Sequence, residues 1–526
     1  MDTKALRQKI LDLAIRGKLV PQDPNDEPAS VLLDRIRAEK QQMVKDGKLK
    51  AKDIKNDTII FKGEDNLHYE KFADGTVKCI EDEIPFELPE GWEWTRLGVI
   101  SSSIQYGLSN PAESNGTHRL LRITDIQDGK VVWENVPFTT ADDSETYLLQ
   151  KGDIVFARTG ATVGKSFLID KLPYESVYAS YLIRIRLLDN ISAEYLYHFF
   201  NSYCYWQQIT NKSVGVGQPN CNGTALKELY IPLPPTLEQL RIVPTVDSIL
   251  EHASIIELEK LSLKEMLVQT RSKILDLAIR GKLVPQDSND EPASALLERI
   301  RTEKEELIKQ GKIKRDKNES VIFRGEDNSY YEKIGDKVRC IDDEMPFELP
   351  DGWEFARLSN ICNINPRNNI DDELITSFVP MSFIGNGFSN TFSFDKRKWK
   401  EIKNGFTHFA ENDIGFAKIT PCFENRKSVV FRDLCNGYGA GTTELFILRP
   451  YCNVIKPNYL LYLIKSEKFI NNGKQTFSGA VGQQRVGKEY VLNYVCPIPP
   501  LAEQIRIANK VLLLLETFDG IEKSLS

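Results

Sequence analysis

ILDLAIRGKLVPQDPNDEPASVLLDRIRAEK, residues 10–40, returns at residues 274–304 as ILDLAIRGKLVPQDSNDEPASALLERIRTEK. The two copies differ only at Pro24/Ser288, Val31/Ala295, Asp34/Glu298 and Ala38/Thr302. A repeat of this length dictates the architecture before any local pattern is considered, because both copies must form the same local structure. The chain is therefore predicted to consist of two related halves.

The likeness continues in three shorter pairs of stretches. FKGEDN at 61–66 matches FRGEDN at 323–328, and ELPEGWEW at 87–94 matches ELPDGWEF at 348–355. IPLPPTLEQLRI at 231–242 matches CPIPPLAEQIRI at 496–507. The long segments before the last pair share only fragments, such as Gly152-Asp-Ile154 and Asn412-Asp-Ile414. The sequence thus indicates two near-identical connectors that carry two dissimilar segments of one diverged fold.

The connectors have apolar residues at the three-four spacing of a coiled-coil seam. One connector is central and ends at Gly281, while the other is divided between the two ends of the sequence. We predict that the two terminal helices lie end to end and pack antiparallel against the central helix, which at ~1.5 Å per residue is roughly 50 Å long. The seam residues are Val246, Ile249, Ile256, Leu263, Leu267, Ile274, Leu277, Val511, Leu514, Phe518, Ile521, Leu6, Ile10 and Leu13.

Three helix starts are predicted from capping patterns. Thr236-Leu-Glu-Gln239 has the spacing of a capping box at the start of the central helix. Asp26 and Asp290 are predicted N-caps of a second, shorter helix after each connector, residues 28–46 and 292–310. The outer faces of these shorter helices are either solvated, salt-bridged surfaces or faces for a partner protein.

The fold class that we predict is α/β, with two mixed α/β domains separated by long antiparallel coiled-coil helices in a pseudo-twofold arrangement with a cyclic internal repeat. Alternating stretches such as 153–158 and 180–186 are typical of strands, and 193–208 has a helical apolar face. The predicted parts are an N-terminal helical region (1–48), a linker (49–94), a first domain (95–235), the central spacer (236–311), a second linker (312–355), a second domain (356–500) and a C-terminal helix (501–526).

Composition excludes several classes of protein. Nine cysteines without a Cys-x-x-Cys pair and five histidines without zinc-site spacing predict no metal centre and no disulfide framework. No apolar run approaches the ~20 residues that span a bilayer, and the polar start lacks a signal peptide, so a cytoplasmic protein is expected. The formal net charge of -7 argues against DNA binding by a global positive field. Any nucleic-acid contact must use local clusters or charge from partners.

The stretch Gly160-Ala-Thr-Val-Gly-Lys-Ser166 resembles a phosphate-binding P-loop but has three residues between its glycines where that motif has four. A basic loop after a strand suits DNA contact instead, because arginine and lysine reach phosphates or guanine and amides pair with adenine. Ordinary polar surface is the alternative for each single residue. The candidate DNA-binding residues are Arg158, Thr159, Lys165, Gln218 and Asn220 in the first domain, and Lys418, Arg426, Lys427, Gln483, Gln484 and Arg485 in the second. Trp92 and Trp353, in the repeated part, are predicted to be core anchors.

Taken together, the GKLVPQ repeats, the LP(E/D)GWE stretches, the PPxxEQxRI stretches and the divergent middles resemble the specificity subunit of type I restriction-modification systems. The resemblance covers essentially the whole chain. It implies that the divergent segments are target recognition domains, each reading one half of a split, asymmetric target in double-stranded DNA. The helical spacer would dock two modification (methyltransferase) subunits, to which restriction (translocase-nuclease) subunits add.

The same resemblance implies that this chain has no catalytic residues and no cofactor of its own. S-adenosylmethionine, ATP and magnesium are then expected in the partner subunits. An alternative is the specificity subunit of a related system whose methyltransferase and nuclease are fused in one polypeptide. Another is a coiled-coil scaffold that binds proteins, which the negative net charge favours and the basic, amide-bearing loops disfavour. An ATPase would rest on the defective glycine loop alone.

Overall fold

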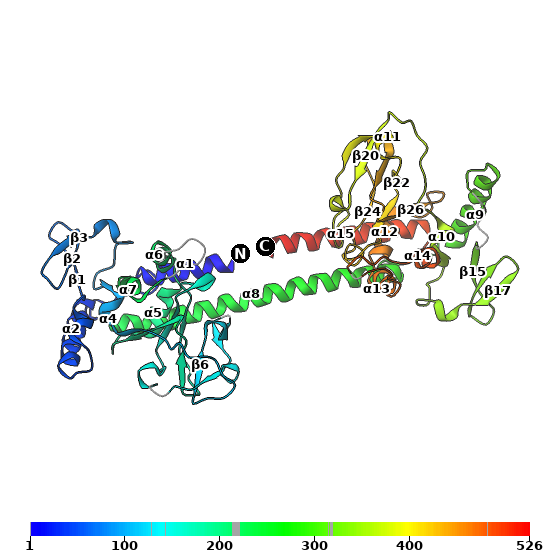
Figure 1. The fold of residues 1–526 in the computed structure, drawn as a ribbon. Helices are drawn as coiled ribbons and strands as arrows, with labels where there is room; N and C mark the ends of the chain where they lie inside the picture. The colour runs from blue at the N-terminus through cyan, green and yellow to red at the C-terminus, as the bar shows by residue number, and fades with distance from the viewer. Residues whose placement is uncertain are drawn as a thin grey trace. The chain divides into compact units, whose positions relative to one another are not determined.

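The structure of the protein is a computed structural model that describes residues 2–127, 129–141, 144–212, 221–313, 315, 319–480 and 482–525. The chain forms two compact units, Met1–Glu259 and Lys260–Ser526. The long helix α8 (Thr236–Ile279) contributes its first part to unit 1 and its last part to unit 2 (Figure 1). None of the described helices is long and apolar enough to cross a lipid bilayer.

Unit 1 combines helices with small sheets. Its other helices are α1 (Thr3–Ile15), α2 (Ala29–Lys45), α3 (Ala51–Ile54), α4 (Leu97–Ile100), α5 (Ala193–Phe200), α6 (Tyr203–Lys212) and α7 (Gly223–Lys227). Its strands are β1 (Ile59–Lys62), β2 (His68–Lys71), β3 (Val77–Cys79), β4 (Glu93–Arg96), β5 (Ser101–Tyr106), β6 (His118–Leu121), β7 (Ile126–Gln127), β8 (Lys130–Val131), β9 (Phe138–Thr139), β10 (Ile154–Ala157), β11 (Ser166–Leu168), β12 (Ser176–Tyr178), β13 (Leu182–Leu187) and β14 (Tyr230–Leu233).

Unit 2 has the same kind of composition. Its other helices are α9 (Ala293–Lys309), α10 (Leu358–Ile361), α11 (Trp399–Ile402), α12 (Pro457–Lys465), α13 (Glu467–Lys474), α14 (Lys488–Asn493) and α15 (Leu501–Leu525). Its strands are β15 (Ser320–Arg324), β16 (Tyr330–Ile334), β17 (Lys337–Cys340), β18 (Glu354–Arg357), β19 (Cys362–Ile364), β20 (Ile375–Val379), β21 (Asp395–Lys398), β22 (Thr407–Ala410), β23 (Ile414–Ala417), β24 (Ser428–Val430), β25 (Tyr438–Gly441), β26 (Leu445–Pro450) and β27 (Val495–Ile498).

The divergent segments of the two units have one topology. The main sheet of unit 1 has the order β11-β10-β13-β5, and that of unit 2 the order β24-β23-β26-β19. In both units a second sheet contains a parallel pair, β12 with β6 and β25 with β20. The prediction that two dissimilar sequences form one α/β fold is therefore confirmed.

One buried ion pair occupies the same place in both main sheets. Arg186 on β13 donates two hydrogen bonds to Asp153, of 2.8 and 2.7 Å. Arg449 on β26 binds Asp413 with the same two distances. These aspartates belong to the short fragments that the two divergent segments share, so the shared fragments correspond to a structural ion pair.

In unit 1 the helix α1 packs against the first part of α8. Ile10, Leu11 and Ala14 are buried together with Ile242 and Val246, and Leu6 and Ile249 pack at the edge of this cluster. Arg7 donates a hydrogen bond of 2.7 Å to the hydroxyl of Ser254. Later residues of α1 contact earlier residues of α8, so the two helices are antiparallel, as predicted.

In unit 2 the helix α15 packs in the same way against the last part of α8. Val511 and Leu515 are buried with Ile274, Leu275 and Ala278. Further along α15, Asp519 and Glu522 accept hydrogen bonds of 2.6 and 2.9 Å from Arg271. Leu267 is also buried, Leu514 and Phe518 pack against this cluster, and Leu13 and Leu277 are half-buried.

Three predicted seam residues are exposed instead. Ile256 and Leu263 on α8 and Ile521 on α15 keep 37%, 37% and 38% of their surface exposed. In unit 1 Arg7 of α1 forms an ion pair with Glu257, next to Ile256, and in unit 2 Arg271 binds Asp519 and Glu522, on either side of Ile521, so Ile256 and Ile521 lie at the ends of the buried seams. The end-to-end placement of the terminal helices is a relation between the units and stays a prediction.

Both units contain the same buried hydrogen bond between a tryptophan and a glutamate, which we call the clamp. The indole nitrogen of Trp92 donates a hydrogen bond of 2.9 Å to Glu238, and Trp353 donates one of the same length to Glu503. Both indoles are 5% exposed, which confirms them as core anchors. In each unit the glutamate of the Pro-Pro-x-x-Glu-Gln-x-Arg-Ile sequence thus fastens the long helix to the tryptophan at the end of the linker.

The capping predictions are wrong. Asp26 and Asp290 do not cap α2 and α9, since Pro28 and Pro292 take the N-cap positions and the two aspartates bind Arg241 and Arg506.

The capping box at Thr236 is wrong as well, because the side chain of Gln239 binds Ser192 N and Pro234 O, at 2.9 and 3.0 Å. The Thr236 hydroxyl is buried and has no hydrogen-bond partner among the residues that the structure describes. Tertiary partners have displaced the local ones.

Candidate nucleic-acid interface

Three loops of unit 2 meet beyond the end of β23. The backbone nitrogen of Lys418 donates to Glu444 O, and that of Val486 donates to Lys418 O, both at 2.9 Å. Thr420 N donates to Gln484 O, also at 2.9 Å. The backbone thus brings Lys418 beside residues 483–485, which are more than sixty positions away in the sequence.

The side chains of this loop cluster differ in their exposure to solvent. Gln483 is exposed, and Gln484 is half-buried with its backbone nitrogen 3.1 Å from the Thr420 hydroxyl. Lys418 is half-buried, and its ammonium lies 5.7 Å from the centroid of the Phe446 ring, within the range of a cation–π contact. The cluster carries the amides of Gln483 and Gln484 and the cations of Lys418 and Arg485 on a backbone joined by hydrogen bonds.

Arg485 is held by an acidic neighbour. Its guanidinium donates hydrogen bonds of 2.9 and 2.8 Å to the carboxylate of Glu444. These bonds lower the pKa of Glu444. Glu444 aligns the planar fork of Arg485, whose side chain keeps 42% of its surface exposed. No pattern in the sequence indicates Glu444, because its partner is 41 residues away.

The other two predicted cations of unit 2 are turned inward. Arg426 donates a hydrogen bond of 3.0 Å to Lys465 O, and burial lowers its pKa. The ammonium of Lys427 donates to the carbonyl oxygens of Met381 and Ile384, both at 2.9 Å. Their internal bonds hold the loop in place, and their contact with DNA stays an untested prediction.

Unit 1 has the same backbone arrangement with different side chains. Arg158 N donates to Tyr181 O at 3.1 Å, and Cys221 N donates to Arg158 O at 3.0 Å. Arg158 therefore corresponds to Lys418, since both follow the same strand and join the same two loops. Its guanidinium lies 4.7 Å from the centroid of the Tyr106 ring, and its Nη1 donates to Ser180 O at 3.4 Å.

Two of the remaining predicted residues of unit 1, Thr159 and Lys165, belong to the described part of the chain. Thr159 is half-buried and Lys165 is exposed. Ala157 N donates to Lys165 O just as Ala417 N donates to Lys427 O, both at 2.9 Å, so the two lysines also correspond. Gln218 and Asn220 lie outside the described residues.

The glycine loop that resembles a P-loop has a packing role. A Cβ atom on Gly164 would lie 2.5 Å from the ring of Trp206, and Tyr205 donates a hydrogen bond of 2.6 Å to Gly164 O. The second glycine is thus covered by aromatic side chains instead of facing a phosphate.

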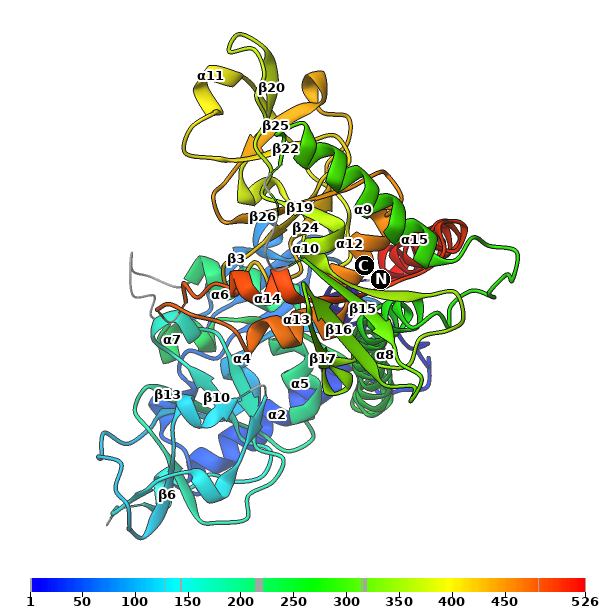
Figure 2. The same ribbon diagram turned by 90° about the vertical axis from the view of Figure 1, so that its right-hand side faces the viewer.

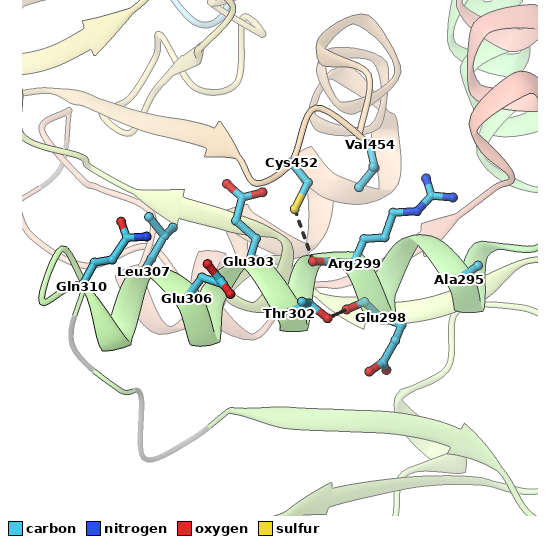
Figure 3. A pocket seen from close by; sticks show the side chains of 10 residues that line it. All are labelled: Ala295, Glu298, Arg299, Thr302, Glu303, Glu306, Leu307, Gln310, Cys452 and Val454. Carbon is cyan, nitrogen blue, oxygen red and sulfur yellow. Dashed lines mark hydrogen bonds between the residues drawn. The ribbon is translucent and has the colours of Figure 1, made fainter.

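A groove lies elsewhere, between α9 and the turn that carries Cys452 and Val454 (Figure 3). It has a volume of about 760 Å³ and is lined by the acidic residues Glu298, Glu303 and Glu306. The thiol of Cys452 donates to Arg299 O at 3.4 Å, and burial raises the pKa of this thiol to about 12. An un-ionised thiol in an acidic groove does not form a nucleophilic centre.

One group of side chains among the described residues has the spacing of metal ligands: His68, Glu81 and Glu87. His68 Nδ1 lies 2.7 Å from Glu81, and Lys62 binds Glu87 at 3.2 Å. The ligand atoms therefore already have protein partners.

Sequence comparison defines the class of this protein. A profile of the family described as Type I restriction modification DNA specificity domain matches residues 89–265 and 350–524. These matches cover more than half of the chain, and the chain belongs to this family. Each match contains one of the loop clusters around Arg158 and Lys418.

Individual relatives agree. The specificity subunit of the type I restriction enzyme EcoAI from Escherichia coli is 46% identical over 254 residues, which cover 48% of this chain and 40% of that protein. The EcoKI specificity subunit from Escherichia coli strain K12 is 31% identical over 221 residues, 39% of this chain and 48% of that protein. The chain thus spans less than half the length of these relatives.

A solved chain described for complex assembly and conformational transition of the type I R-M system has the same fold. It superposes with a TM-score of 0.50 and 18% identity, covering 84% of this chain and 94% of that chain.

Proposed function

We propose that this chain is the DNA sequence-specificity subunit of a type I restriction-modification complex. The observation that carries the proposal is the pair of loop clusters, which have one backbone arrangement and different side chains at the same positions. Two unlike reading surfaces on a repeated frame suit a split, asymmetric target, whereas identical surfaces would suit a palindrome.

The chain is proposed to act without catalytic residues of its own, inside the cytoplasm. Two modification subunits bind the helical connectors and carry S-adenosylmethionine, and restriction subunits add ATP-driven cleavage with magnesium. The net charge of -7 fits this division, because partners then supply much of the charge that neutralises DNA phosphates. Base flipping belongs to the modification subunit.

The loop clusters provide the first test. We expect Lys418→Ala and Arg158→Ala each to weaken DNA binding by the chain in complex with purified methyltransferase subunit. A base contact predicts a loss of about 1 to 3 kcal/mol together with relaxed specificity in one half-site, and a phosphate contact predicts a salt slope smaller by about 1. Mobility shifts at several salt concentrations measure both quantities.

Lys418→Arg is the matched control, because it keeps the charge and should keep the salt slope. A complex that binds its target equally well with both residues replaced by alanine would place the reading surface elsewhere. Binding of proteins but of no DNA by the wild-type complex would favour a coiled-coil scaffold.

A further inference from the structure

The two small sheets β1-β2-β3 and β15-β16-β17 have no role in the function proposed so far. They lie between the connectors and the divergent segments, and outside the family matches at 89–265 and 350–524. Figure 1 shows each as a small sheet at the edge of its own unit, and Figure 2 shows β15, β16 and β17 side by side. Both sheets are antiparallel throughout.

The apolar residues on the inner face of each sheet are buried against neighbouring strands. Ile60 and Ile80 are buried with Trp94 and Tyr230 in unit 1. Ile322 and Ile341 are buried with Phe355 and Val495 in unit 2. The inner faces therefore fix the sheets on the strands β4 and β18, and only the outer faces are free to bind another molecule.

The outer faces carry matching residues at matching positions. The strand register places Phe61, Tyr69 and Cys79 in one row and Ile59, Lys71 and Val77 in the next. The second sheet has Phe323, Tyr331 and Cys340 in one row and Val321, Lys333 and Val338 in the next. Each face is thus mainly apolar, with one lysine.

These apolar side chains are open to solvent. Val77 and Val338 are 52% and 53% exposed, and Phe61 and Phe323 are 38% and 37% exposed. A contiguous apolar surface of this kind, as opposed to scattered single residues, marks a site of protein association.

The faces are also rigid. Phe61 stacks on Tyr69 and Phe323 stacks on Tyr331, with ring centroids 5.9 Å apart in both sheets. The Tyr69 hydroxyl donates to Asp65 at 2.7 Å, and this bond fixes its ring. A surface ordered in advance loses little conformational entropy on binding.

The rim of each face is acidic, which indicates the chemistry of the partner. In each segment the exposed carboxylates outnumber the exposed cations: Glu64, Asp65, Asp74, Asp82 and Glu83 against Lys62, Lys71 and Lys78 in unit 1, and Glu326, Asp327, Asp336, Asp342, Asp343 and Glu344 against Arg324, Lys333, Lys337 and Arg339 in unit 2. Such a rim repels DNA phosphates and attracts a protein surface whose apolar patch is bordered by basic side chains.

Matching exposed residues are not required by the fold. The divergent segments keep one topology with different sequences, so the fold tolerates wide change. The outer faces of the small sheets have nonetheless kept the same residue types in both units. The simplest explanation for the matching residues is that both faces bind the same molecule.

We propose that the outer faces of β1-β2-β3 and β15-β16-β17 are two equivalent docking surfaces for two copies of one protein, which presents an apolar patch with a basic border. The inference rests on the proposed function, in which this protein is the methyltransferase subunit. It assigns to the subunit a contact on each small sheet in addition to the helical connectors.

Alkylation of the exposed cysteines tests directly whether a partner covers the two faces. Cys79 and Cys340 lie on the two faces and are the exposed free cysteines among the described residues. Alkylation of the full chain, with and without purified methyltransferase subunit, can be followed peptide by peptide by mass spectrometry. Both thiols should be protected in the complex. Unchanged labelling of both in an assembled complex overturns the inference.

Substitutions on the same surfaces test the inference through the number of methyltransferase subunits that each chain binds. Val77→Glu should lower the number of bound methyltransferase subunits per chain from two to one, Val338→Glu should do the same, and the double variant should bind neither tightly. Val132→Glu is the matched control, because Val132 is 58% exposed and lies outside both sheets. Circular dichroism and thermal unfolding of each variant show that it is folded.

The outcomes separate the two proposals. If the wild-type chain binds no methyltransferase subunit, the proposed function fails and the docking inference fails with it. If the wild-type complex assembles and the folded double variant still binds two subunits, only the docking inference fails. If the chain alone dimerises and Val77→Glu prevents it, the occupant is a second copy of this chain and the inference is overturned.

Discussion

Buried ion pairs hold each small sheet on the strand that follows it. Arg357 Nε donates to Glu332 at 2.9 Å, and Arg96 Nε donates to Glu70 at the same distance. Burial alone would raise the pKa of Glu332, but the hydrogen bonds, led by that from Arg357, prevail and lower it to about 2. Removing a carboxylate with such partners strongly lowers the stability of the folded state, because it leaves a buried charge without its partner.

We expect Glu332→Gln to lower the free energy of unfolding by about 3 kcal/mol at neutral pH, since one partner of a buried pair is lost. The contribution of Glu332 is present above the ordinary pKa of 4.5 and disappears as pH falls toward 2. The difference between wild type and variant should therefore shrink over that window in guanidinium unfolding followed by tryptophan fluorescence.

Glu326→Gln, at an exposed position beside the same sheet, is the control for this prediction and should leave stability nearly unchanged. A difference between wild type and Glu332→Gln that does not vary with pH would show that the charge of Glu332 is not what stabilises the sheet.

Sequence patterns identified some of the single residues correctly. The repeated tryptophans were predicted as core anchors, and both are buried. Lys418 and residues 483–485 were predicted as DNA-binding candidates on basic, amide-bearing loops; the backbone brings them together, and their contact with DNA stays a prediction. The inward turn of Arg426 and Lys427 was not predictable. The carbonyl groups that bind them come from residues 465, 381 and 384, which only the tertiary fold brings near.

At the scale of elements, glycines end the helices for two different reasons. Gly17 follows α1 with a φ of 62°, and a Cβ atom there would lie 2.4 Å from the ring of Pro89. Gly47 follows α2 with a φ of 72° and has nothing within 4 Å of such an atom. Both positions need a left-handed backbone, but only Gly17 is also enclosed.

Alanine substitutions separate these two costs. Gly47→Ala should lower stability by about 1 kcal/mol, the cost of a left-handed alanine, whereas Gly17→Ala should cost roughly 3 kcal/mol because overpacking against Pro89 is added. Thermal unfolding of the two variants measures the difference. Equal shifts in Tm would show that Pro89 moves away from a Cβ atom at position 17 at no cost in stability.

The elements themselves were largely predictable, and their local caps were not. Apolar spacing predicted α8 and its antiparallel partners, and Gly281 predicted where α8 ends. Thr236, Asp26 and Asp290 have the right types and spacings for caps, yet their tertiary surroundings decide differently. A polar side chain near a helix start has distant partners that a local pattern cannot show.

At the scale of the whole molecule, the internal repeat predicted what the two units share. Both contain the clamp between a tryptophan and a glutamate, and both have the same order of strands in the main sheet. The shared fragments Gly152-Asp-Ile154 and Asn412-Asp-Ile414 place Arg158 opposite Lys418 in the sequence, and the backbone hydrogen bonds confirm that both residues join the same two loops.

The central claim is that each unit reads one half of the DNA target independently. The most direct measurement replaces Thr95–Leu229 by the corresponding segment of a relative and maps the methylated sites in the genome of cells that carry the assembled complex. The account predicts that one half-site changes while the other half-site and the spacing between them stay the same. A change in both half-sites, or a change in the spacing alone, would contradict it.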